Sequence, residues 1–259
     1  MSLIEDRAGL GRVSEFEGRV ALVTGGAGHV GSSMVRSLAT AGAHVAVAHH
    51  SGGEAAERLV GDIRRAGGTA VAVQADLGDP DAVDRLVDNV GKDLGPIDIL
   101  VANAGVGKVR SWKDVGPEEF DDALAINLRA PYLLARKVLP SMTERSWGRI
   151  LFVSSIAAML GGPFGPDYSA SKAALHGLVH YFAPQVAAQG VTVNVLAPAL
   201  MGEHSVAMMD AEVGQAIAAS IPVGRIGAME ELADYALAVL RNGYLTNKVL
   251  PIDGGMFAH

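Results

Sequence analysis

The chain of 259 residues contains no cysteine and few aromatic residues, and each scarcity narrows what the protein can be. Without cysteine there is no disulfide bond, no thiolate metal site and no cysteine nucleophile, and no other metal site is predicted. Aromatic residues make up 5% of the chain, whereas 49% is hydrophobic and 32 residues are glycine. The apolar residues are therefore mostly small, which favours closely packed helix and sheet layers over an aromatic-rich all-β fold.

Positive charge and long hydrophobic runs are scarce as well. The chain has 21 lysine and arginine residues against 28 aspartate and glutamate residues, so its formal net charge is −7. This balance predicts no nucleic-acid partner and no attraction to an anionic membrane. No apolar run reaches the roughly 18 residues of a membrane span, and the first residues lack the hydrophobic core of a signal peptide. We therefore expect a cytoplasmic protein.

Beyond an N-terminal tail (1–18), short β-rich runs alternate with helical stretches. Most of these runs are continuous in Val, Leu, Ile and Ala, as expected of strands that helices cover on both faces. The alternation predicts one α/β domain over 19–259, with a Rossmann-like, doubly wound parallel sheet of about seven strands and helices on both faces. The predicted strands are 19–24, 44–49, 69–75, 97–103, 149–155, 191–197 and 248–253, and the predicted helices include 29–41, 53–66, 80–94, 127–144 and 168–188.

A glycine-rich loop, TGGAGHVG, follows the first predicted strand and opens a helix. It can be read as Gly26-x-Gly28-x-x-Gly31 or as Thr24-Gly25-x-x-Gly28-x-x-Gly31, and both are spacings of dinucleotide-binding loops. Glycines leave room for a pyrophosphate there, and the helix N-terminus offers it unpaired N–H groups and a partial positive charge. The alternative, a glycine-rich turn that binds nothing, is disfavoured by the strand–turn–helix context.

The end of the second predicted strand should meet the adenosine ribose of the nucleotide. A carboxylate there would favour a free 2′-hydroxyl, but none occurs before Glu54. His49, His50 and Ser51 stand there instead, and His50 and Ser51 can donate hydrogen bonds to a 2′-phosphate, with His50 partly cationic beside it. We therefore favour NADP as the cofactor, with NAD not excluded. A pair of solvent-facing histidines is the alternative.

Tyr168 and Lys172 lie four residues apart at the start of a predicted helix and so share one of its faces. A lysine ammonium close to a phenol can lower the tyrosine pKa towards the range of a general acid or base. Ser155 ends a strand at the same edge of the sheet and can hydrogen-bond a substrate oxygen. By itself, Tyr-x-x-x-Lys usually marks a surface pair; with Ser155 and the glycine loop, the combination predicts catalysis.

This combination resembles the short-chain dehydrogenase/reductase family in its compact single-domain form, and within it the 3-oxoacyl carrier-protein reductases. The resemblance runs from about Arg19 to the C-terminus and includes ADL, NAG, INL, YSASK and DGGM in order. It implies hydride transfer between a nicotinamide cofactor and a ketone or secondary alcohol. Tyr168 would exchange the proton, Ser155 would polarise the oxygen, Lys172 would depress the tyrosine pKa and hold the nicotinamide ribose, and Asn127 would hold a proton-relay water.

The same resemblance implies further contacts and a homotetramer, with helices near 117–144 and 168–188 pairing between subunits and the C-terminal strand in a second interface. The substrate would lie among 106–113, 156–167 and a loop at 199–220. The predicted cofactor-binding residues are Thr24, Gly25, Gly28, His29, Val30, Gly31, His50, Ser51, Asp76, Leu77, Asn103, Ala104, Gly105, Tyr168, Lys172, Pro198 and Met201.

The chain also departs from the family pattern. In the glycine loop, His29 stands where compact members have glycine, so the glycine spacing fits the extended members, which include sugar-nucleotide epimerases. Extended members have a second domain, however, and the roughly 60 residues that follow NVLAP are too few for one. In the following loop, Ala199 and Glu203 replace a glycine and a threonine that meets the nicotinamide, which puts cofactor contacts there in doubt. Pro184 should kink or shorten the helix that starts near Tyr168.

Several functions remain open. A small-molecule ketone or alcohol is the expected substrate, and a 3-oxoacyl thioester, a sugar and a polyol are all compatible with the motifs. Lys108, Arg110 and Lys113 could meet an acidic carrier or a phosphopantetheine phosphate, unless they only form a solvated loop. An enoyl reductase would need a tyrosine where Pro166 stands. A non-catalytic NADPH-binding regulator would be expected to lack the Ser-Tyr-Lys set.

Overall fold

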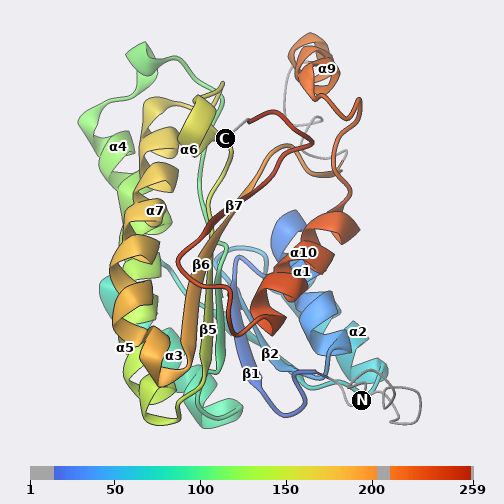
Figure 1. Ribbon diagram of the computed structural model, residues 1–259, viewed down its shortest axis with the longest axis vertical. Helices are drawn as coiled ribbons and strands as arrows, with labels where there is room; N and C mark the ends of the chain where they lie inside the picture. Colours follow the sequence, from blue (N-terminus) through green and yellow to red (C-terminus); the bar gives the residue numbers. More distant parts are fainter. Residues whose placement is uncertain (1–14, 203–210, 258–259) are drawn as a thin grey trace, which may run out of the picture.

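The computed structural model describes residues 15–202 and 211–257. Within them, seven parallel strands form one sheet in the order β3-β2-β1-β4-β5-β6-β7 (Figure 1). The predicted α/β, Rossmann-like doubly wound sheet is therefore confirmed, and each predicted strand occurs within two residues of its expected ends. The strands are β1 Val20–Thr24, β2 His44–His49, β3 Ala70–Gln74, β4 Ile99–Ala102, β5 Gly148–Val153, β6 Val191–Pro198 and β7 Val249–Ile252.

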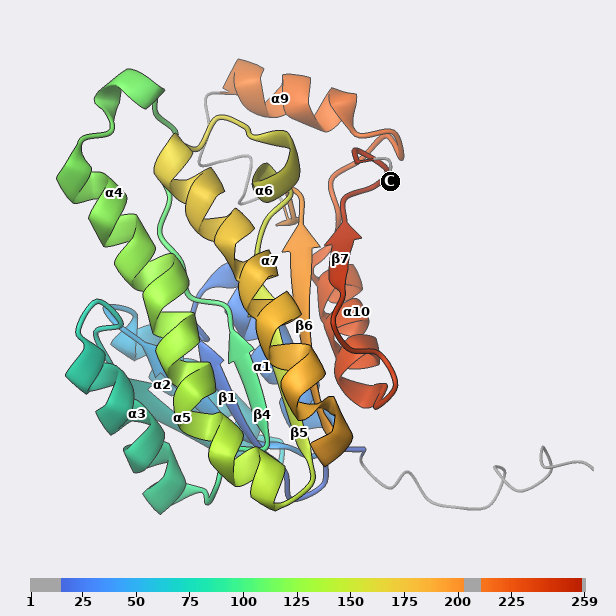
Figure 2. The same ribbon diagram turned by 60° about the vertical axis from the view of Figure 1, so that its left-hand side comes forward.

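Helices cover both faces of the sheet (Figure 2). Successive side chains of each strand point to opposite faces, so Leu22 and Leu100 join one core cluster while Val23 and Val101 join the other. The first cluster includes residues of α3, α5 and α7, and the second includes residues of α1, α2 and α10. The helices are α1 His29–Thr40, α2 Gly53–Arg65, α3 Pro80–Asp93, α4 Pro117–Leu124, α5 Ala130–Glu144, α6 Ala157–Leu160, α7 Pro166–Val186, α9 Ala211–Ser220 and α10 Met229–Arg241.

The helix predicted over 127–144 differs from the structure in both its start and its regularity. It begins ten residues earlier, as α4, and passes through a π-helical turn, Ala125–Arg129, before continuing as α5. The wider turn holds Asn127, whose side chain is fully buried. Such π-helical turns are frequent at functional sites because they redirect one side chain out of the helical pattern. α7 contains Pro184, and its α-helical part ends at Val186, two residues short of the predicted end.

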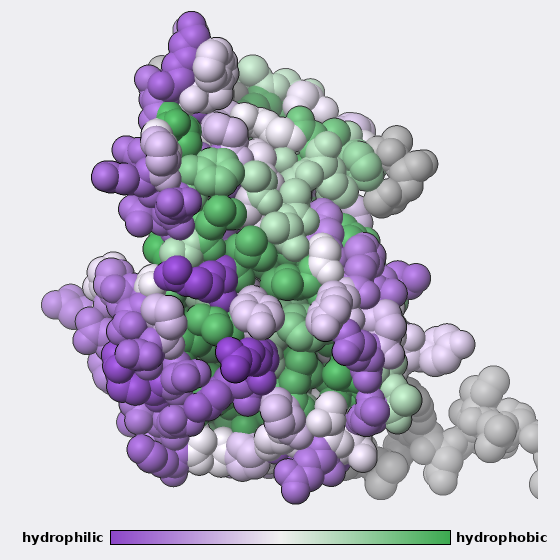
Figure 3. Space-filling view, turned by 90° about the vertical axis from the view of Figure 1, so that its left-hand side faces the viewer, coloured by the Kyte–Doolittle hydropathy of each residue, from purple (hydrophilic) through white to green (hydrophobic). Residues whose placement is uncertain are grey.

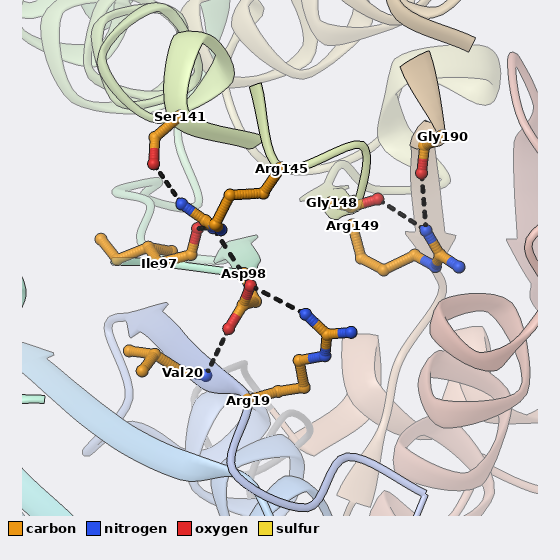
Figure 4. Close-up of polar contacts among 9 residues, drawn as sticks. All are labelled: Arg19, Val20, Ile97, Asp98, Ser141, Arg145, Gly148, Arg149 and Gly190. Carbon is orange, nitrogen blue, oxygen red and sulfur yellow. Dashed lines mark hydrogen bonds and ion pairs between the residues drawn. The ribbon is translucent and has the colours of Figure 1, made fainter. Parts of the chain in front are cut away.

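At the amino end of the sheet, opposite the carboxyl ends of the strands, Asp98 joins three segments (Figure 4). Its carboxylate accepts hydrogen bonds from the Val20 amide at 3.0 Å, from Arg19 Nη1 at 3.3 Å and from Arg145 Nη2 at 3.1 Å. Arg145 also donates to the Ile97 carbonyl oxygen. This buried carboxylate therefore ties β1, the start of β4 and the end of α5 together.

None of the helices among the described residues is long and apolar enough to pass through a membrane.

Candidate active site

A cavity of about 790 Å³ opens at the carboxyl ends of the strands. In an open α/β sheet, ligands bind at this edge, where the strand order reverses; here the reversal lies between β1 and β4. Most of the predicted site residues line the cavity: Gly25, Gly28, His29, Val30, His50, Ser51, Asn103, Ala104, Gly105, Ser155, Tyr168, Lys172, Pro198 and Met201. Thr24, Gly31, Asp76, Leu77 and Asn127 do not line it.

The glycines of the β1–α1 loop are required by space as well as by backbone angle. Gly25 has a φ of +61°, a left-handed conformation that side chains rarely adopt. A Cβ on Gly31 would collide with the Gly25 carbonyl oxygen, and one on Gly26 would lie 2.9 Å from the Val23 carbonyl oxygen. Gly28 ends the loop as the N-cap of α1 and has no side chain to block the helix N–H groups. The cradle therefore fits a dinucleotide pyrophosphate.

Thr24 and Asn103 join this loop to the end of β4. The Thr24 hydroxyl oxygen accepts hydrogen bonds from the amides of Asn103 and Ala104, both at 3.1 Å. The Asn103 side chain donates to the carbonyl oxygens of Thr24 at 2.9 Å and of Gly25 at 3.3 Å. Thr24 is buried and does not line the cavity, so these hydrogen bonds join the loop to the end of β4, and its cofactor contact stays a prediction.

His49, His50 and Ser51 also line the cavity, from the end of β2 and the turn after it. The Nδ1 atom of His49 is buried and has no hydrogen-bond partner. Asp76 serves a turn, because its carboxylate accepts a hydrogen bond from the Gly78 amide at 2.9 Å. Leu77 packs against the core cluster. The cofactor contacts of these two residues stay predictions.

Ser155, Tyr168 and Lys172 meet in the cavity from β5 and α7. The buried Lys172 ammonium donates a hydrogen bond to the Val153 carbonyl oxygen at 2.8 Å and lies 5.8 Å from the centre of the Tyr168 ring. The adjacent Ser154 hydroxyl donates to the Lys172 carbonyl oxygen at 2.8 Å. The spacing along α7 thus places the phenol and the ammonium on one face, as predicted from the sequence.

Two effects act on the pKa of Tyr168 in this arrangement, and its lowering by Lys172 stays a prediction. Burial raises the pKa of Tyr168, and a hydrogen bond with Ser155 opposes that rise. Burial also lowers the pKa of Lys172 to about 8, because taking the ammonium out of water destabilises its charged form. The Lys172 ammonium donates to the Val153 carbonyl oxygen, and the hydrogen bond with Ser155 acts to lower the pKa of Tyr168.

Asn127 acts on the backbone beside the catalytic lysine. Its side chain accepts a hydrogen bond from the Val106 amide and donates one to the Val106 carbonyl oxygen, both at 2.8 Å. It also donates to the Ser171 hydroxyl at 3.0 Å. Both amide hydrogens are thereby used, and Asn127 fixes the chain just after Gly105, whose backbone packs against Lys172.

Only some residues of the predicted substrate region line the cavity. Of 106–113, Gly107 lines the cavity, whereas Trp112 is 72% exposed and does not. Leu160, Phe164, Leu200 and Met201 line it, together with Ile217 and Ser220 of α9 and with Met256. Met256 was not predicted, because nothing local in the sequence brings the chain end back to the site. Glu203, Met208 and Met209 lie outside the described residues.

The three basic residues Lys108, Arg110 and Lys113 do not form one cluster in the structure. Arg110 turns inward and pairs with the buried carboxylate of Asp167, Nη2 to Oδ2, at 2.5 Å. Lys108 and Lys113 are exposed. Arg110 is therefore already neutralised by a partner from the first turn of α7, and it does not join the two lysines as a third cation for an acidic carrier.

The low pKa of Lys172 predicts a specific pH dependence of stability. Below about pH 8 the lysine is charged in both the folded and unfolded states. Between about pH 8 and 10.5 the folded state releases its proton first, so the free energy of unfolding rises with pH. Relative to Lys172→Met, the wild type should gain up to about 3 kcal/mol over this range, at roughly 1.4 kcal/mol per pKa unit. Urea unfolding of both proteins from pH 7 to 10.5 measures this; parallel curves would contradict it.

Comparisons with known proteins agree with this geometry. Residues 19–214 match the family described as short chain dehydrogenase. An acetoacetyl-CoA reductase of Allochromatium vinosum is 35% identical over 93% of this chain and 99% of its own length. A 3-oxoacyl-[acyl-carrier-protein] reductase of Haemophilus influenzae is 32% identical over the same shares of both chains.

One solved structure extends the likeness to three dimensions. It is a blue fluorescent protein from a metagenomic library, in complex with NADPH. The two folds agree with a TM-score of 0.84 at 31% identity, covering 94% of this chain and all of the other. The chain therefore belongs to the short-chain dehydrogenase/reductase family of NAD(P)-dependent oxidoreductases.

Proposed function

We propose that the protein reduces an apolar ketone with NADPH, Tyr168 acting as the proton donor. The observation that supports this most is the meeting of Ser155, Tyr168 and Lys172 in a cavity whose other end is the glycine cradle of the β1–α1 loop. The nicotinamide, when bound, supplies the hydride. The protein supplies position and proton: Ser155 hydrogen-bonds the substrate oxygen, and Tyr168 protonates that oxygen.

In this proposal Lys172 and Asn127 support the reacting groups. The buried ammonium of Lys172 is positioned to hold the nicotinamide ribose hydroxyls, and through its positive charge it stabilises the phenolate that Tyr168 leaves behind. Asn127 keeps the Val106 backbone and Gly105 against Lys172, through hydrogen bonds at 2.8 Å. A water between Lys172 and solvent would return the proton, as the family resemblance implies.

The choice of NADPH over NADH is supported by the adenosine end of the cavity. His50 and Ser51 line it and can donate hydrogen bonds to a 2′-phosphate, while no carboxylate lines it among the described residues. A carboxylate in this place would repel the 2′-phosphate of NADPH and so select for NADH. Without that carboxylate, this selection against NADPH is removed.

An apolar substrate is supported by the lining of the cavity. Ile156, Leu160, Phe164, Leu200, Met201 and Ile217 line it, and no aspartate, glutamate or arginine does among the described residues. A sugar or polyol would need several hydrogen-bond partners there, because a site that binds hydroxyl groups must pair them. We therefore favour a 3-oxoacyl thioester or another apolar ketone over a sugar or polyol.

The test is the oxidation of NADPH, followed by absorbance, with the N-acetylcysteamine thioester of a 3-oxoacyl chain, with a bicyclic ketone and with a ketose. NADH is run in parallel. We expect turnover of one of the apolar ketones, with kcat/KM at least tenfold higher for NADPH than for NADH. Equal values for the two cofactors would contradict the NADPH proposal, and a preference for the ketose would contradict the apolar substrate.

We also propose a homotetramer in which α5 and α7 pair between subunits. Figure 3 shows the face formed by α4, α5 and α7, with a band of hydrophobic residues running along its middle. Leu133, Leu178 and Phe182 are partly buried there, and Tyr181 of α7 is 64% exposed. Apolar bands of this kind usually mark contacts between proteins. Light scattering measures the mass in solution, and the mass of one chain would contradict the proposal.

A further inference from the structure

Two segments that are far apart in the sequence run side by side next to Tyr168. Val109 forms an isolated antiparallel bridge with Phe164. The Arg110 amide donates a hydrogen bond to the Pro163 carbonyl oxygen at 3.1 Å, and the Gly165 amide donates to the Lys108 carbonyl oxygen at 3.3 Å. We call this pair of segments, residues 106–111 and 163–167, the strap.

The strap holds the Tyr168 ring from two sides. Gly107, of the first segment, lies so close to the ring that a Cβ on it would be 2.5 Å from Tyr168 Cδ2. Phe164, of the second segment, has its ring centre 5.2 Å from that of Tyr168, with 40° between the ring planes. Any change in the position of either segment would therefore move the phenol relative to Ser155 and the substrate.

A buried ion pair joins the two segments of the strap. Arg110 Nη2 meets Asp167 Oδ2 at 2.5 Å, and the side chains are 17% and 1% exposed. Asp167 immediately precedes Tyr168, in the first turn of α7, where the partial positive charge of the helix N-terminus also favours a carboxylate. Two further polar atoms of the pair, Arg110 Nε and Asp167 Oδ1, are buried without a hydrogen-bond partner.

Such a pair is a weak way to stabilise a fold, since apolar residues of similar volume often do as well or better. An ion pair does, however, require one mutual arrangement of its two partners, whereas apolar side chains tolerate several. Gly165 makes room for this arrangement, because a Cβ there would collide with Asp167 Oδ1 and lie 3.2 Å from Arg110 Cγ. The geometry therefore favours orientation over stability as the role of the pair.

We propose that Arg110 and Asp167 are positioning residues for the reaction: their ion pair sets the strap against the first turn of α7 and thereby orients the Tyr168 phenol. Neither residue lines the cavity, so neither touches the cofactor or substrate within it. The proposal rests on the proposed function for its effect on turnover, but the orientation of the ring can be measured without any substrate.

The experiment compares Asp167→Asn, Arg110→Met and the apolar double variant Arg110→Met/Asp167→Leu. Lys137→Gln is the matched control, because it breaks an exposed ion pair with Asp88 between α5 and α3, whose contact is 3.2 Å. We expect each strap variant to lower kcat at least tenfold, with the dissociation constant of NADPH changed less than twofold and KM less than threefold. The control should keep the wild-type kcat.

The apolar double variant separates orientation from stability. If the pair positions Tyr168, this variant should unfold at a temperature close to that of the wild type and yet keep the low kcat. Recovery of the wild-type kcat in the stable double variant would overturn the proposal.

The second readout uses 3-fluorotyrosine and 19F NMR, with no ketone present. The chain has five tyrosines, and Tyr168→Phe assigns the signal of Tyr168. We expect the strap variants to shift this signal while the signal of Tyr244 stays in place. An unchanged Tyr168 signal would overturn the positioning role. A shifted signal in a protein that reduces no ketone would support the positioning role and contradict the proposed function alone.

Discussion

Replacing Tyr168 with phenylalanine is expected to lower kcat for ketone reduction by about two to four orders of magnitude, the range for losing one general acid. The substitution removes only the hydroxyl group, so the packing of the ring between Gly107 and Phe164 should remain. NADPH should bind the variant with a dissociation constant within about threefold of the wild-type value. Single-turnover absorbance measures the chemical step, and NADPH fluorescence measures binding.

The matched control is Tyr181→Phe, on the same helix but with the side chain 64% exposed. It should leave both kcat and binding unchanged. Because burial raises the pKa of Tyr168, the phenol keeps its proton at neutral pH and can donate it. Up to about pH 8, where Lys172 keeps its charge, the reductive kcat of the wild type should therefore show no loss of this acid. A Tyr168→Phe variant with more than a tenth of the wild-type kcat would exclude Tyr168 as the proton donor.

Replacing Asp98 with alanine is expected to lower the free energy of unfolding by about 3 kcal/mol, the lower end of the range for breaking a buried ion pair. The Asp98 side chain is 9% exposed and meets both Arg19 and Arg145 (Figure 4). Without it, two guanidinium groups and the Val20 amide lose an acceptor. The lower end applies because the two arginines are 38% and 29% exposed and can turn towards water.

Urea unfolding at pH 7 measures this loss, with Asp88→Ala as the control. Asp88 is half exposed and pairs with Lys137 on the surface, so its loss should change the free energy of unfolding by at most about 1 kcal/mol. Asp98 lies at the edge of the sheet opposite the cavity. Its removal should therefore leave kcat per folded molecule unchanged. A loss of stability no larger than that of the control would show that Asp98 is not needed to join the three segments.

The fold and the meeting of Ser155, Tyr168 and Lys172 in one cavity could be predicted because their signals are local. A strand covered on both faces must be apolar along its whole length, as Val20–Val23 is. Gly25 is needed for its φ of +61°, and Gly31 because the Gly25 carbonyl oxygen leaves no room for a Cβ. The four-residue spacing of Tyr168 and Lys172 places both on one face of any α-helix. Each of these inferences depends on residues within one or two turns of chain.

Other features depend on partners far away in the sequence, and local periodicity does not report them. Arg110 is paired with a carboxylate 57 residues later. A residue that the sequence places in a solvated basic loop is therefore partly buried, and its partner precedes Tyr168. The sequence around Asn127 predicts an ordinary helix and not a π-helical turn. The turn directs Asn127 to the Val106 backbone, which lies 21 residues earlier in the chain.

The sequence by itself determined the sheet, the glycine loop and the placement of Tyr168 and Lys172 on one helix face, since steric and helical repeat rules act within a short stretch of chain. Only the tertiary structure decided how those groups are charged and held. The Lys172 ammonium donates to the Val153 carbonyl oxygen, and burial acts to raise the pKa of Tyr168. Desolvation depends on everything packed around a side chain, and that environment exists only once the chain has folded.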